Sequence, residues 1–504
     1  MAYLLGIDLG TSSVKSVLMD QEGTLLAIRQ QEYTFDIPRE GWAEQDPEVW
    51  WQATAKTVRE ALQQAEIVPS EIVGVGFSGQ MHGLVPLDKN GKPIRKAIIW
   101  CDQRSVAQVE RIRQIIGVKR LGEITRNQIA TGFQTASLLW MKEHEPKLYE
   151  KTAVVVLPKD YLKYKLTGKL STDVTDAAST LAFDVCQGKW STELIQNLGL
   201  NPQLYPPVFL PEELGGLVTK DAANQTGLLE GTKVFHGGAD QVMQAIGNGI
   251  IAPGQVSVTI GTGGQVFAPL TSPLYDPQLR SHTFHNFSRN SWFFMGATLS
   301  AGLSLRWLRD TVLGGMSYQE MDKLVSNVER GSEGLIYLPY LSGERTPHMD
   351  PYARGMFFGL TLHHSRAHMM RAVMEGVVFS LRDCLELFYQ MGQNCEKVIA
   401  SGGGARSGPW LQMQADILNR EIYTSKMLEQ AGVGAAISAG VGAGVYESYR
   451  QACDKVIQWN QVPCTPDPQG VAQYQEYYQL FKELYQVNKP YMERCTRLSQ
   501  RQEI

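Results

Sequence analysis

Charged residues are scarce in this chain of 504 residues. Lys and Arg total 47 and Asp and Glu total 51, so 19% of the chain is charged, against roughly 25% in an average domain. The formal net charge is −4. This balance excludes a basic nucleic-acid-binding surface spread over the whole chain and a polycationic membrane binder. Hydrophobic residues reach 43%, so the low charge does not indicate disorder.

Cysteine is also sparse, and no C-x-x-C motif occurs. The seven cysteines are scattered and odd in number, which disfavours a disulfide framework or a structural zinc site. The longest membrane-like run, at 432–445, is shorter than the roughly 20 residues that a spanning helix needs. The opening MAYLLGIDLG lacks the basic region of a signal peptide. We therefore expect a cytoplasmic protein without nucleic-acid or membrane partners.

Two familiar nucleotide-binding motifs are excluded. No G-x-x-x-x-G-K-[ST] segment occurs, so the chain has no P-loop. The segment GVGFSG at 74–79 fits G-x-G-x-x-G, but its glycines lie within and just after an expected strand. Another apolar run follows instead of the helix that a dinucleotide fingerprint requires. A nicotinamide-binding site is therefore not expected here.

Glycine is abundant, with 48 residues, and it separates strands in two similar arrangements. Alternating apolar patterns predict strands at 4–7, 14–19, 24–28 and 72–77, with a helix beginning after Asp46–Pro47. A similar but weaker pattern in the second half of the chain predicts strands at 255–260, 265–268 and 398–400, with a long helix from Ser365. The repeated unit indicates an α/β protein of two related lobes that meet near 247–253.

One glycine turn opens each lobe, and each carries a small hydroxyl residue. Gly10, Thr11 and Ser12 form the first turn, and Gly261 and Thr262 belong to the second. Such turns present N–H groups to a phosphate, although an ordinary hairpin also uses glycine in this way. The matched pair favours an ATP clamp between the lobes. Asp8, before the first turn, suits a magnesium ion or serves only to form the turn.

Asp240 follows an expected strand and begins an expected helix. It is interpreted equally well as a helix N-cap or as a general base. His282 and His285 lie at an odd spacing on an expected strand, so their rings face opposite sides and a metal site is not expected. His363 and His364 are expected in an exposed loop before a helix.

Four segments together resemble a known family. GIDLGTSSVK and TIGTGG are similar to the two phosphate hairpins of the FGGY carbohydrate kinases, within the actin-like ATPase superfamily. ASGGGARS, at 400–407, resembles the adenosine loop of that family, and 355–375 fits its long C-terminal signature position by position. The resemblance implies an α/β fold of two ribonuclease H-like lobes, 1–248 and 249–504, with an active-site cleft between them.

Further segments resemble the branch of this family that acts on xylulose, namely SGQMHG, WCDQR, LPKDYLKYKLTG, DAAST, HGGADQ and YLSGERTPH. The resemblance implies that ATP phosphorylates D-xylulose at the C5 hydroxyl, with Asp240 as the catalytic base. It also implies sugar contacts from Met81, His82, Arg104 and Gln241. Other family members that act on gluconate, ribulose or glycerol remain alternatives, as does an actin-like ATPase that serves as a scaffold or chaperone.

The same resemblance assigns the cofactors, ATP and Mg²⁺. Asp8 would hold the metal, and ATP would contact Gly10, Thr11, Ser12, Gly261, Thr262, Gly302, Gly403 and Gly404. A homodimer is frequent in the family. Three positions depart from its usual pattern, because Gly263 replaces a serine, Gln241 an asparagine and Ser137 a lysine.

Overall fold

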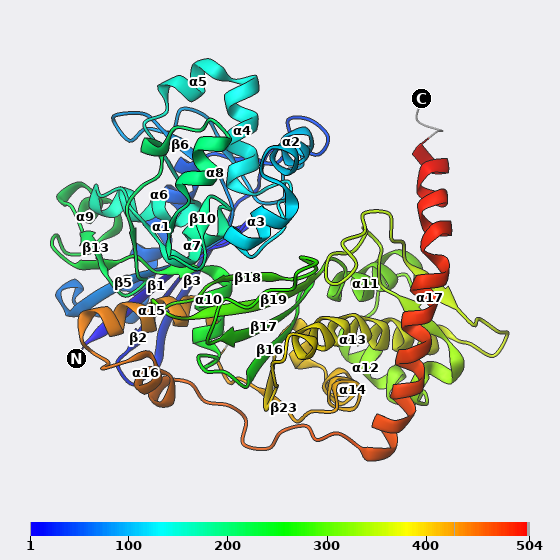
Figure 1. The fold of residues 1–504 in the computed structure, drawn as a ribbon. Helices are drawn as coiled ribbons and strands as arrows, with labels where there is room; N and C mark the ends of the chain where they lie inside the picture. Colours follow the sequence, from blue (N-terminus) through cyan, green and yellow to red (C-terminus); the bar gives the residue numbers. More distant parts are fainter. Residues whose placement is uncertain (1, 428, 501–504) are drawn as a thin grey trace.

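A computed structural model describes residues 2–427 and 429–500, and it forms two lobes that each contain a central sheet (Figure 1). The first sheet has seven strands, in which β15 (Gly238–Ala239) pairs with β5 beside the main path. The order along that path is β13 (Leu214–Leu217), β14 (Lys233–Phe235), β5 (Ile72–Gly79), β1 (Tyr3–Leu9), β2 (Ser13–Asp20) and β3 (Leu25–Glu32).

The first sheet confirms the strands predicted for the start of the chain. β1, β2 and β3 form an antiparallel meander, while β5 lies parallel to β1 on the other side. Asp46 caps helix α1 (Pro47–Ala65) by accepting a hydrogen bond from Glu48 N, as its position before Pro47 predicts. Trp50 and Trp51 of α1 are buried, so the helix covers one face of the meander.

Between β5 and β14 the chain forms a series of short helices and strands. These helices supply much of the apolar core of this lobe. They are α2 (Val106–Ile116), α3 (Val118–Thr125), α4 (Gln134–His144), α5 (Pro146–Lys151), α6 (Pro158–Thr167), α7 (Val174–Ser179), α8 (Thr192–Asn197) and α9 (Lys220–Thr226). The accompanying strands are β6 (Val85–Leu87), β7 (Ala97–Ile98), β8 (Val154–Val156), β9 (Thr172–Asp173), β10 (Phe183–Asp184), β11 (Lys189–Trp190) and β12 (Val208–Phe209). The short strand β4 (Glu44–Gln45) comes earlier in the chain, before α1, and pairs with β7.

The second sheet has six strands and repeats the arrangement of the first. Its order is β18 (His282–His285), β19 (Trp292–Thr298), β17 (Gly264–Leu270), β16 (Gln255–Ile260), β22 (Lys397–Gly402) and β23 (Ile422–Thr424). Ser365 caps the long helix α13 (Arg366–Gln390), as predicted, and α14 (Gly408–Leu418) packs against it. Further elements of this lobe are α11 (Gly302–Trp307), α12 (Tyr318–Val325), β20 (Ile336–Leu338) and β21 (Met356–Phe358).

Helix α15 (Gln430–Ala443) joins the two lobes. It follows β23 in the chain, yet it packs against β1 and β5 of the first sheet and against α10 (Asp240–Gly247). The approach is so close that a Cβ atom on Gly76 would lie 2.1 Å from the carbonyl oxygen of Ala435. This contact explains why the strand at 74–79 contains glycine: the helix can pack closely against it. The segment therefore needs no dinucleotide-binding role.

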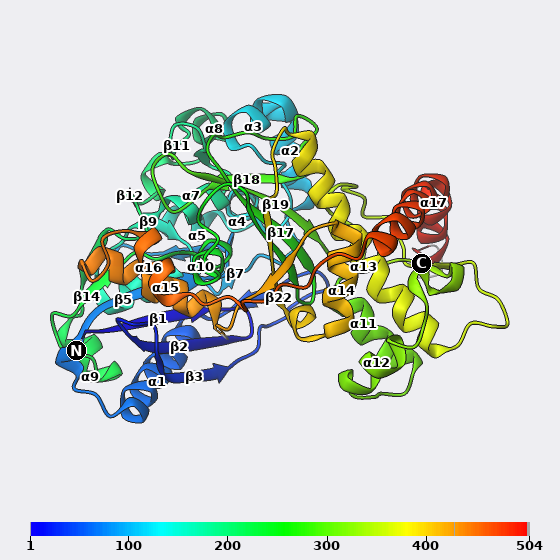
Figure 2. The ribbon, with the colours of Figure 1, turned by 90° about the horizontal axis from the view of Figure 1, so that it is seen from below.

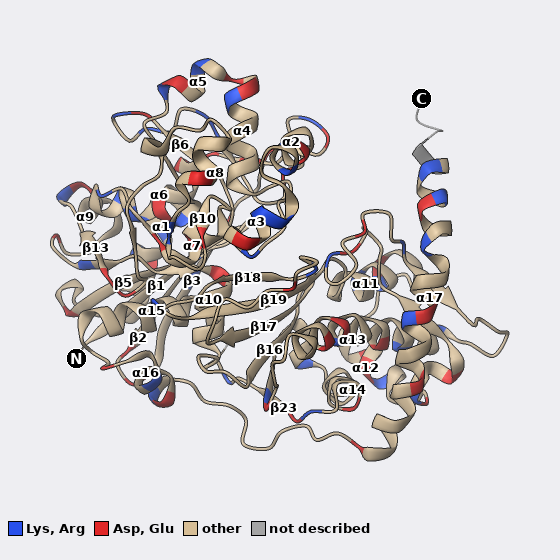
Figure 3. Ribbon diagram, viewed as in Figure 1, with Lys and Arg blue, Asp and Glu red and all other residues tan. Residues whose placement is uncertain are grey.

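The chain returns to the second lobe after α16 (Tyr449–Val456). Its last helix, α17 (Pro468–Gln500), lies along the outer side of that lobe, as both ribbon views show (Figure 1 and Figure 2). Tyr474, Tyr478 and Phe481 are buried, so this amphipathic helix packs against its own lobe. Acidic and basic residues are interspersed along α17 and α5 (Figure 3). Among the described residues, no helix is both long and apolar enough to cross a membrane.

Candidate active site

The first glycine turn joins β1 to β2, and its carbonyl groups all have protein partners. The Tyr33 hydroxyl donates to the carbonyl of Gly10 at 2.7 Å, and Tyr33 N donates to the carbonyl of Ser12 at 3.0 Å. Gln45 Nε2 donates to the carbonyl of Thr11 at 2.6 Å. Protein donors therefore occupy the carbonyl oxygens of the turn, which lowers the electrostatic repulsion that an anion bound at the turn would meet.

The second turn, between β16 and β17, achieves the same result with backbone groups. Gly302 N donates to the carbonyl of Gly261 at 2.8 Å, while Ala301 N and Leu303 N donate to the carbonyl of Thr262 at 3.1 and 3.0 Å. A Cβ atom on Gly302 would lie 2.4 Å from the Gly261 oxygen, so the start of α11 approaches the turn only because residue 302 is glycine.

A pocket of about 430 Å³ lies beside the second turn. The structure brings Gly261, Thr262, Gly302, Gly403 and Gly404 together in its wall, although they come from three separate segments. Other side chains in the wall are Leu305, Arg306, Tyr318, Gln319, Met321, Asp322, Arg406, Ser407 and Trp410. This set provides apolar surface with a few polar groups, which suits a nucleoside.

The glycine at position 263 has a steric reason. A Cβ atom built there would lie 2.6 Å from the carbonyl oxygen of Thr298, on the neighbouring strand β19. A serine at this position would require the turn to move away from β19. The departure from the family pattern is thus matched to the backbone of this chain.

Asp8 and Asp240 are the two carboxyl groups at the ends of β1 and β15. Burial raises the pKa of Asp8, although the Ser78 hydroxyl, which donates to Oδ1 at 2.7 Å, and the charge of Lys15 oppose this rise. Burial and the nearby charge of Asp8 raise the pKa of Asp240 to about 7. Two neighbouring carboxyl groups with raised pKa values fit a divalent cation, which would relieve their repulsion.

Asp240 does not cap its helix. Ala239 is the N-cap of α10, and no side chain makes a capping hydrogen bond there. Asp240 Oδ1 is buried and accepts no hydrogen bond from the residues that the structure describes. Of the two interpretations of Asp240 that the sequence allows, the N-cap is therefore wrong. A buried carboxylate oxygen without a partner is costly, and such groups are frequent at functional sites.

Met81 and His82 follow β5, which pairs with β15 at Ser78 and Gly79. His82 has a φ of 71°, a conformation that few non-glycine residues adopt. Its Nδ1 lies 2.8 Å from the carbonyl oxygen of Ser179, which can only accept a hydrogen bond, so Nδ1 carries the proton. Burial lowers the pKa of His82 to about 4, and the ring is neutral with Nε2 as an acceptor.

Arg104 and Gln241 occupy different surroundings. The Arg104 guanidinium is fully buried, forms ion pairs with Asp102 and Glu44 at 2.8 and 2.7 Å, and lies 3.8 Å from the Trp42 ring centroid. The structure thus gives Arg104 an ion-pairing role within its own lobe. Gln241 adjoins the catalytic candidate directly, and its hydrogen bonds partly oppose the rise in the pKa of Asp240.

His282 and His285 lie on a strand, and His363 and His364 precede helix α13, as the sequence predicts. His282 and His285 are both buried on β18, and His282 Nδ1 lies 3.0 Å from Asn127 Oδ1 in the other lobe. His363 is exposed and pairs with Glu333 at 2.7 Å. No sequence pattern indicates Tyr33 and Gln45 as residues of the site, because the hydrogen-bond partners of a turn depend on tertiary contacts.

Comparisons with known proteins agree with this geometry. Residues 3–247 match the N-terminal domain of the FGGY family of carbohydrate kinases, and residues 256–443 match its C-terminal domain. A xylulose kinase of Bacillus subtilis is 38% identical over 485 residues, which cover 96% of this chain and 97% of the relative.

Solved structures agree in the same way. The crystal structure of xylulose kinase from Rhodospirillum rubrum has a TM-score of 0.90 and 29% identity, and it covers 97% of this chain and 99% of that one. That of gluconate kinase from Lactobacillus acidophilus has a TM-score of 0.91 and 26% identity over 97% and 98% of the two chains. The matched fold, the pair of glycine turns and the full coverage lead to one conclusion, that this chain belongs to the FGGY family of carbohydrate kinases.

Proposed function

We propose that this protein transfers the γ-phosphoryl group of MgATP to the C5 hydroxyl of D-xylulose, with Asp240 as the general base. The observation that carries the proposal is the unpartnered, buried Oδ1 of Asp240, whose pKa of about 7 suits proton transfer near neutral pH. Relatives named xylulose kinase, matched over nearly the whole chain, support the choice of sugar.

Asp240 accepts the proton of the sugar hydroxyl as the hydroxyl oxygen attacks the γ-phosphorus. The bond from that phosphorus to the bridging oxygen breaks, and ADP leaves with the electron pair. Little covalent help is needed from the protein, because positioning and charge neutralisation dominate phosphoryl transfer. Asp8 would hold Mg²⁺, which neutralises charge on the phosphates when bound.

The remaining residues bind and orient the two substrates. The N–H groups of Thr11, Ser12 and Thr262 would donate to the phosphates, whereas those of Gly10 and Gly261 donate within their own turns to Ser13 and Gly263. The carbonyl groups of Gly10, Thr11, Ser12, Gly261 and Thr262 accept from protein donors. The pocket beside the second turn accommodates the nucleoside. His82 Nε2 accepts a hydrogen bond from a sugar hydroxyl, and Met81 packs beside it. Holding the terminal hydroxyl in line with the phosphorus is worth several kcal/mol, on the order of 7 or more in favourable cases.

A coupled assay of ADP release tests the proposal directly. Wild type is supplied with MgATP and, in turn, D-xylulose, L-xylulose, D-ribulose, gluconate, glycerol or no sugar. We expect strong stimulation by D-xylulose and its loss in Asp240→Ala. Equal ADP release with and without every sugar would refute a sugar kinase and favour an ATPase that acts as a scaffold.

Gluconate is the second candidate substrate, because a gluconate kinase has a TM-score of 0.91 with this chain. Gln241 adjoins Asp240 and differs from the asparagine usual in the xylulose branch, so it is the position to vary. Stimulation by gluconate alone would retain the kinase and change the substrate. Gln241→Asn is then expected to alter the ratio of kcat/KM between the two sugars.

A further inference from the structure

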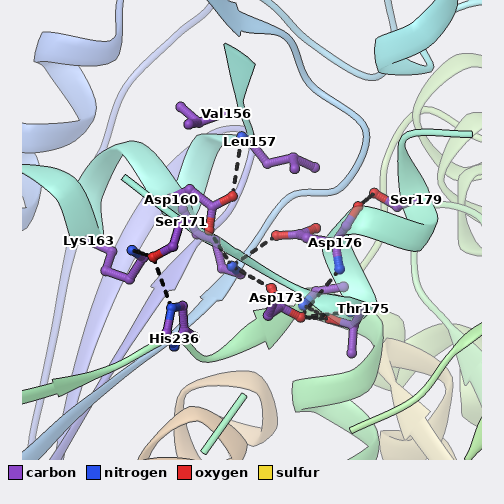
Figure 4. Close-up of polar contacts among 12 residues, drawn as sticks. Val156, Leu157, Asp160, Lys163, Ser171, Asp173, Thr175, Asp176, Ser179 and His236 are labelled. Atoms are coloured by element: carbon purple, nitrogen blue, oxygen red, sulfur yellow. Dashed lines mark hydrogen bonds and ion pairs between the residues drawn. The ribbon is translucent and has the colours of Figure 1, made fainter. Parts of the chain in front are cut away.

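Helix α7 is a six-residue helix whose residues are all buried. A helix of this length is not stable by itself, so its surroundings must hold it. Asp173 is its N-cap, and Oδ1 accepts hydrogen bonds from Thr175 N at 2.8 Å and from the Thr175 hydroxyl (Figure 4). The start of α7 is therefore fixed by one carboxylate.

A buried ammonium group fixes that carboxylate in turn. Lys159 Nζ lies 2.7 Å from Asp160, 2.6 Å from Asp173 and 3.2 Å from Asp176, and all four side chains are fully buried. Burial opposes a charge on Lys159, but the three carboxyl groups raise its pKa well above the usual value. Lys159 thus remains an ammonium, with its Nζ within 3.2 Å of all three carboxyl groups.

The start of α7 contacts β15, the strand that directly precedes Asp240. Because the Thr175 hydroxyl donates its hydrogen to Asp173, its oxygen is free to accept, and Ala239 N donates to it at 2.8 Å. Ala239 directly precedes Asp240, and on its other side β15 pairs with β5. The strand β15 has only two residues, and the hydrogen bond from Ala239 N to the Thr175 hydroxyl adds to its pairing with β5 in orienting it.

The end of α7 contacts the residue expected to bind the sugar. The Ser179 carbonyl accepts from His82 Nδ1 at 2.8 Å, and the Ser179 hydroxyl accepts from His82 N at 3.3 Å. That hydroxyl also donates to the carbonyl of Asp176 at 2.8 Å. These bonds hold both the backbone and the ring of a residue in a strained conformation.

We infer that α7 is a positioning element that sets the catalytic base and the sugar-binding histidine relative to each other, with Thr175 acting on Asp240 and Ser179 acting on His82. This inference rests on the proposed function for its kinetic consequence, but its structural part does not. Thr175 and Ser179 are positioning residues, because each acts through another group. Thr175, at the start of the helix, thereby controls kcat, and Ser179, at its end, controls the KM for the sugar.

The test compares Thr175→Val with Thr54→Val. Thr54 is equally buried, and its hydroxyl donates to the Trp50 carbonyl within its own helix α1, so it is a matched control for the loss of a hydroxyl. Thr175→Val is expected to lower kcat about 10-fold to 100-fold, since small misplacements of reacting groups cost up to about 100-fold. The KM for the sugar should stay within about threefold, and Thr175→Ser should restore kcat.

Ser179→Ala provides the opposite pattern. Loss of the acceptor for His82 N is expected to raise the KM for the sugar about 10-fold or more with a smaller effect on kcat. A loss of folded protein would lower the apparent kcat and leave the KM unchanged, so kcat is expressed per folded enzyme in every variant, Thr54→Val included. Equal kcat in Thr175→Val and Thr54→Val, or the same kcat-to-KM pattern at both ends, would overturn the inference.

Hydrogen exchange measured by mass spectrometry separates this inference from the proposed function. Peptides that contain 238–242 should take up deuterium faster in Thr175→Val than in wild type or Thr54→Val, whatever the substrate. Unchanged uptake would overturn the inference even if the enzyme is a xylulose kinase. Failure of D-xylulose to stimulate wild type would refute the proposed function, while faster uptake would still support the role of Thr175.

Discussion

Asp240→Asn should stabilise the protein while it removes activity. The folded-state pKa of Asp240 is about 7, above its ordinary value of 3.8, because burial and Asp8 disfavour the charged form. The folded protein therefore binds this proton more tightly than the unfolded chain does. Below pH 3.8 the carboxyl group imposes no cost on folding, between 3.8 and about 7 the cost accumulates, and above about 7 it is complete.

The size of the effect follows from that interval. At about 1.4 kcal/mol per pH unit, the interval between the two pKa values corresponds to a folding cost of about 4 kcal/mol for the charged carboxyl group. Partial contact of Asp240 with solvent reduces this cost to about 2–4 kcal/mol. An unfolding entropy of about 2.1 cal/mol/K per residue converts this to a rise in Tm of about 2–4 °C at pH 8. At pH 5 the wild-type carboxyl is protonated in the folded state, so the rise should be less than half as large.

Differential scanning calorimetry at pH 5 and pH 8 measures both values. Asp454→Asn is the control, because Asp454 is exposed and the same charge is removed without burial. The coupled assay should show that Asp240→Asn loses about 10²–10⁴ in kcat, the range for a general base. A Tm difference that is absent at pH 8, or equal at the two pH values, would refute the assignment of a buried, charged base.

Three further predictions concern the same site. Asp8→Asn should raise the Mg²⁺ concentration for half-maximal rate about 10-fold or more, and an unchanged Mg²⁺ titration would contradict its role as a metal ligand. Gly302→Ala should raise the KM for ATP but not for the sugar, because its Cβ would lie 2.4 Å from the Gly261 oxygen; Gly408→Ala, where a Cβ meets open space, should leave both constants unchanged. The kcat/KM of wild type should fall as the pH drops through about 7, where Asp240 gains its proton, whereas His82, with a pKa of about 4, should not contribute to this limb.

Local patterns were sufficient to predict most of the elements near the site. Alternation along β1, β2 and β16 predicted strands, and Asp46 and Ser365 predicted the starts of α1 and α13, because these signals depend on neighbouring residues alone. The role of Arg104 shows the limit of such reasoning. Its ion pairs with Glu44 and Asp102 form across separate segments, and the position of Glu44 beside them could not be derived from spacing.

The sequence by itself determined the family, the two glycine turns and the identity of the carboxyl groups that end β1 and β15. Only the tertiary structure decided that Asp240 is not the N-cap of its helix and that glycine at position 76 allows helix α15 to pack closely on the sheet. It also decided that Thr175 contacts the strand that precedes the catalytic candidate Asp240. The physical reason is that short-range periodicity and turn chemistry act within a few residues. The pKa of a buried carboxyl and the partner of a hydroxyl depend instead on segments that are distant in the chain.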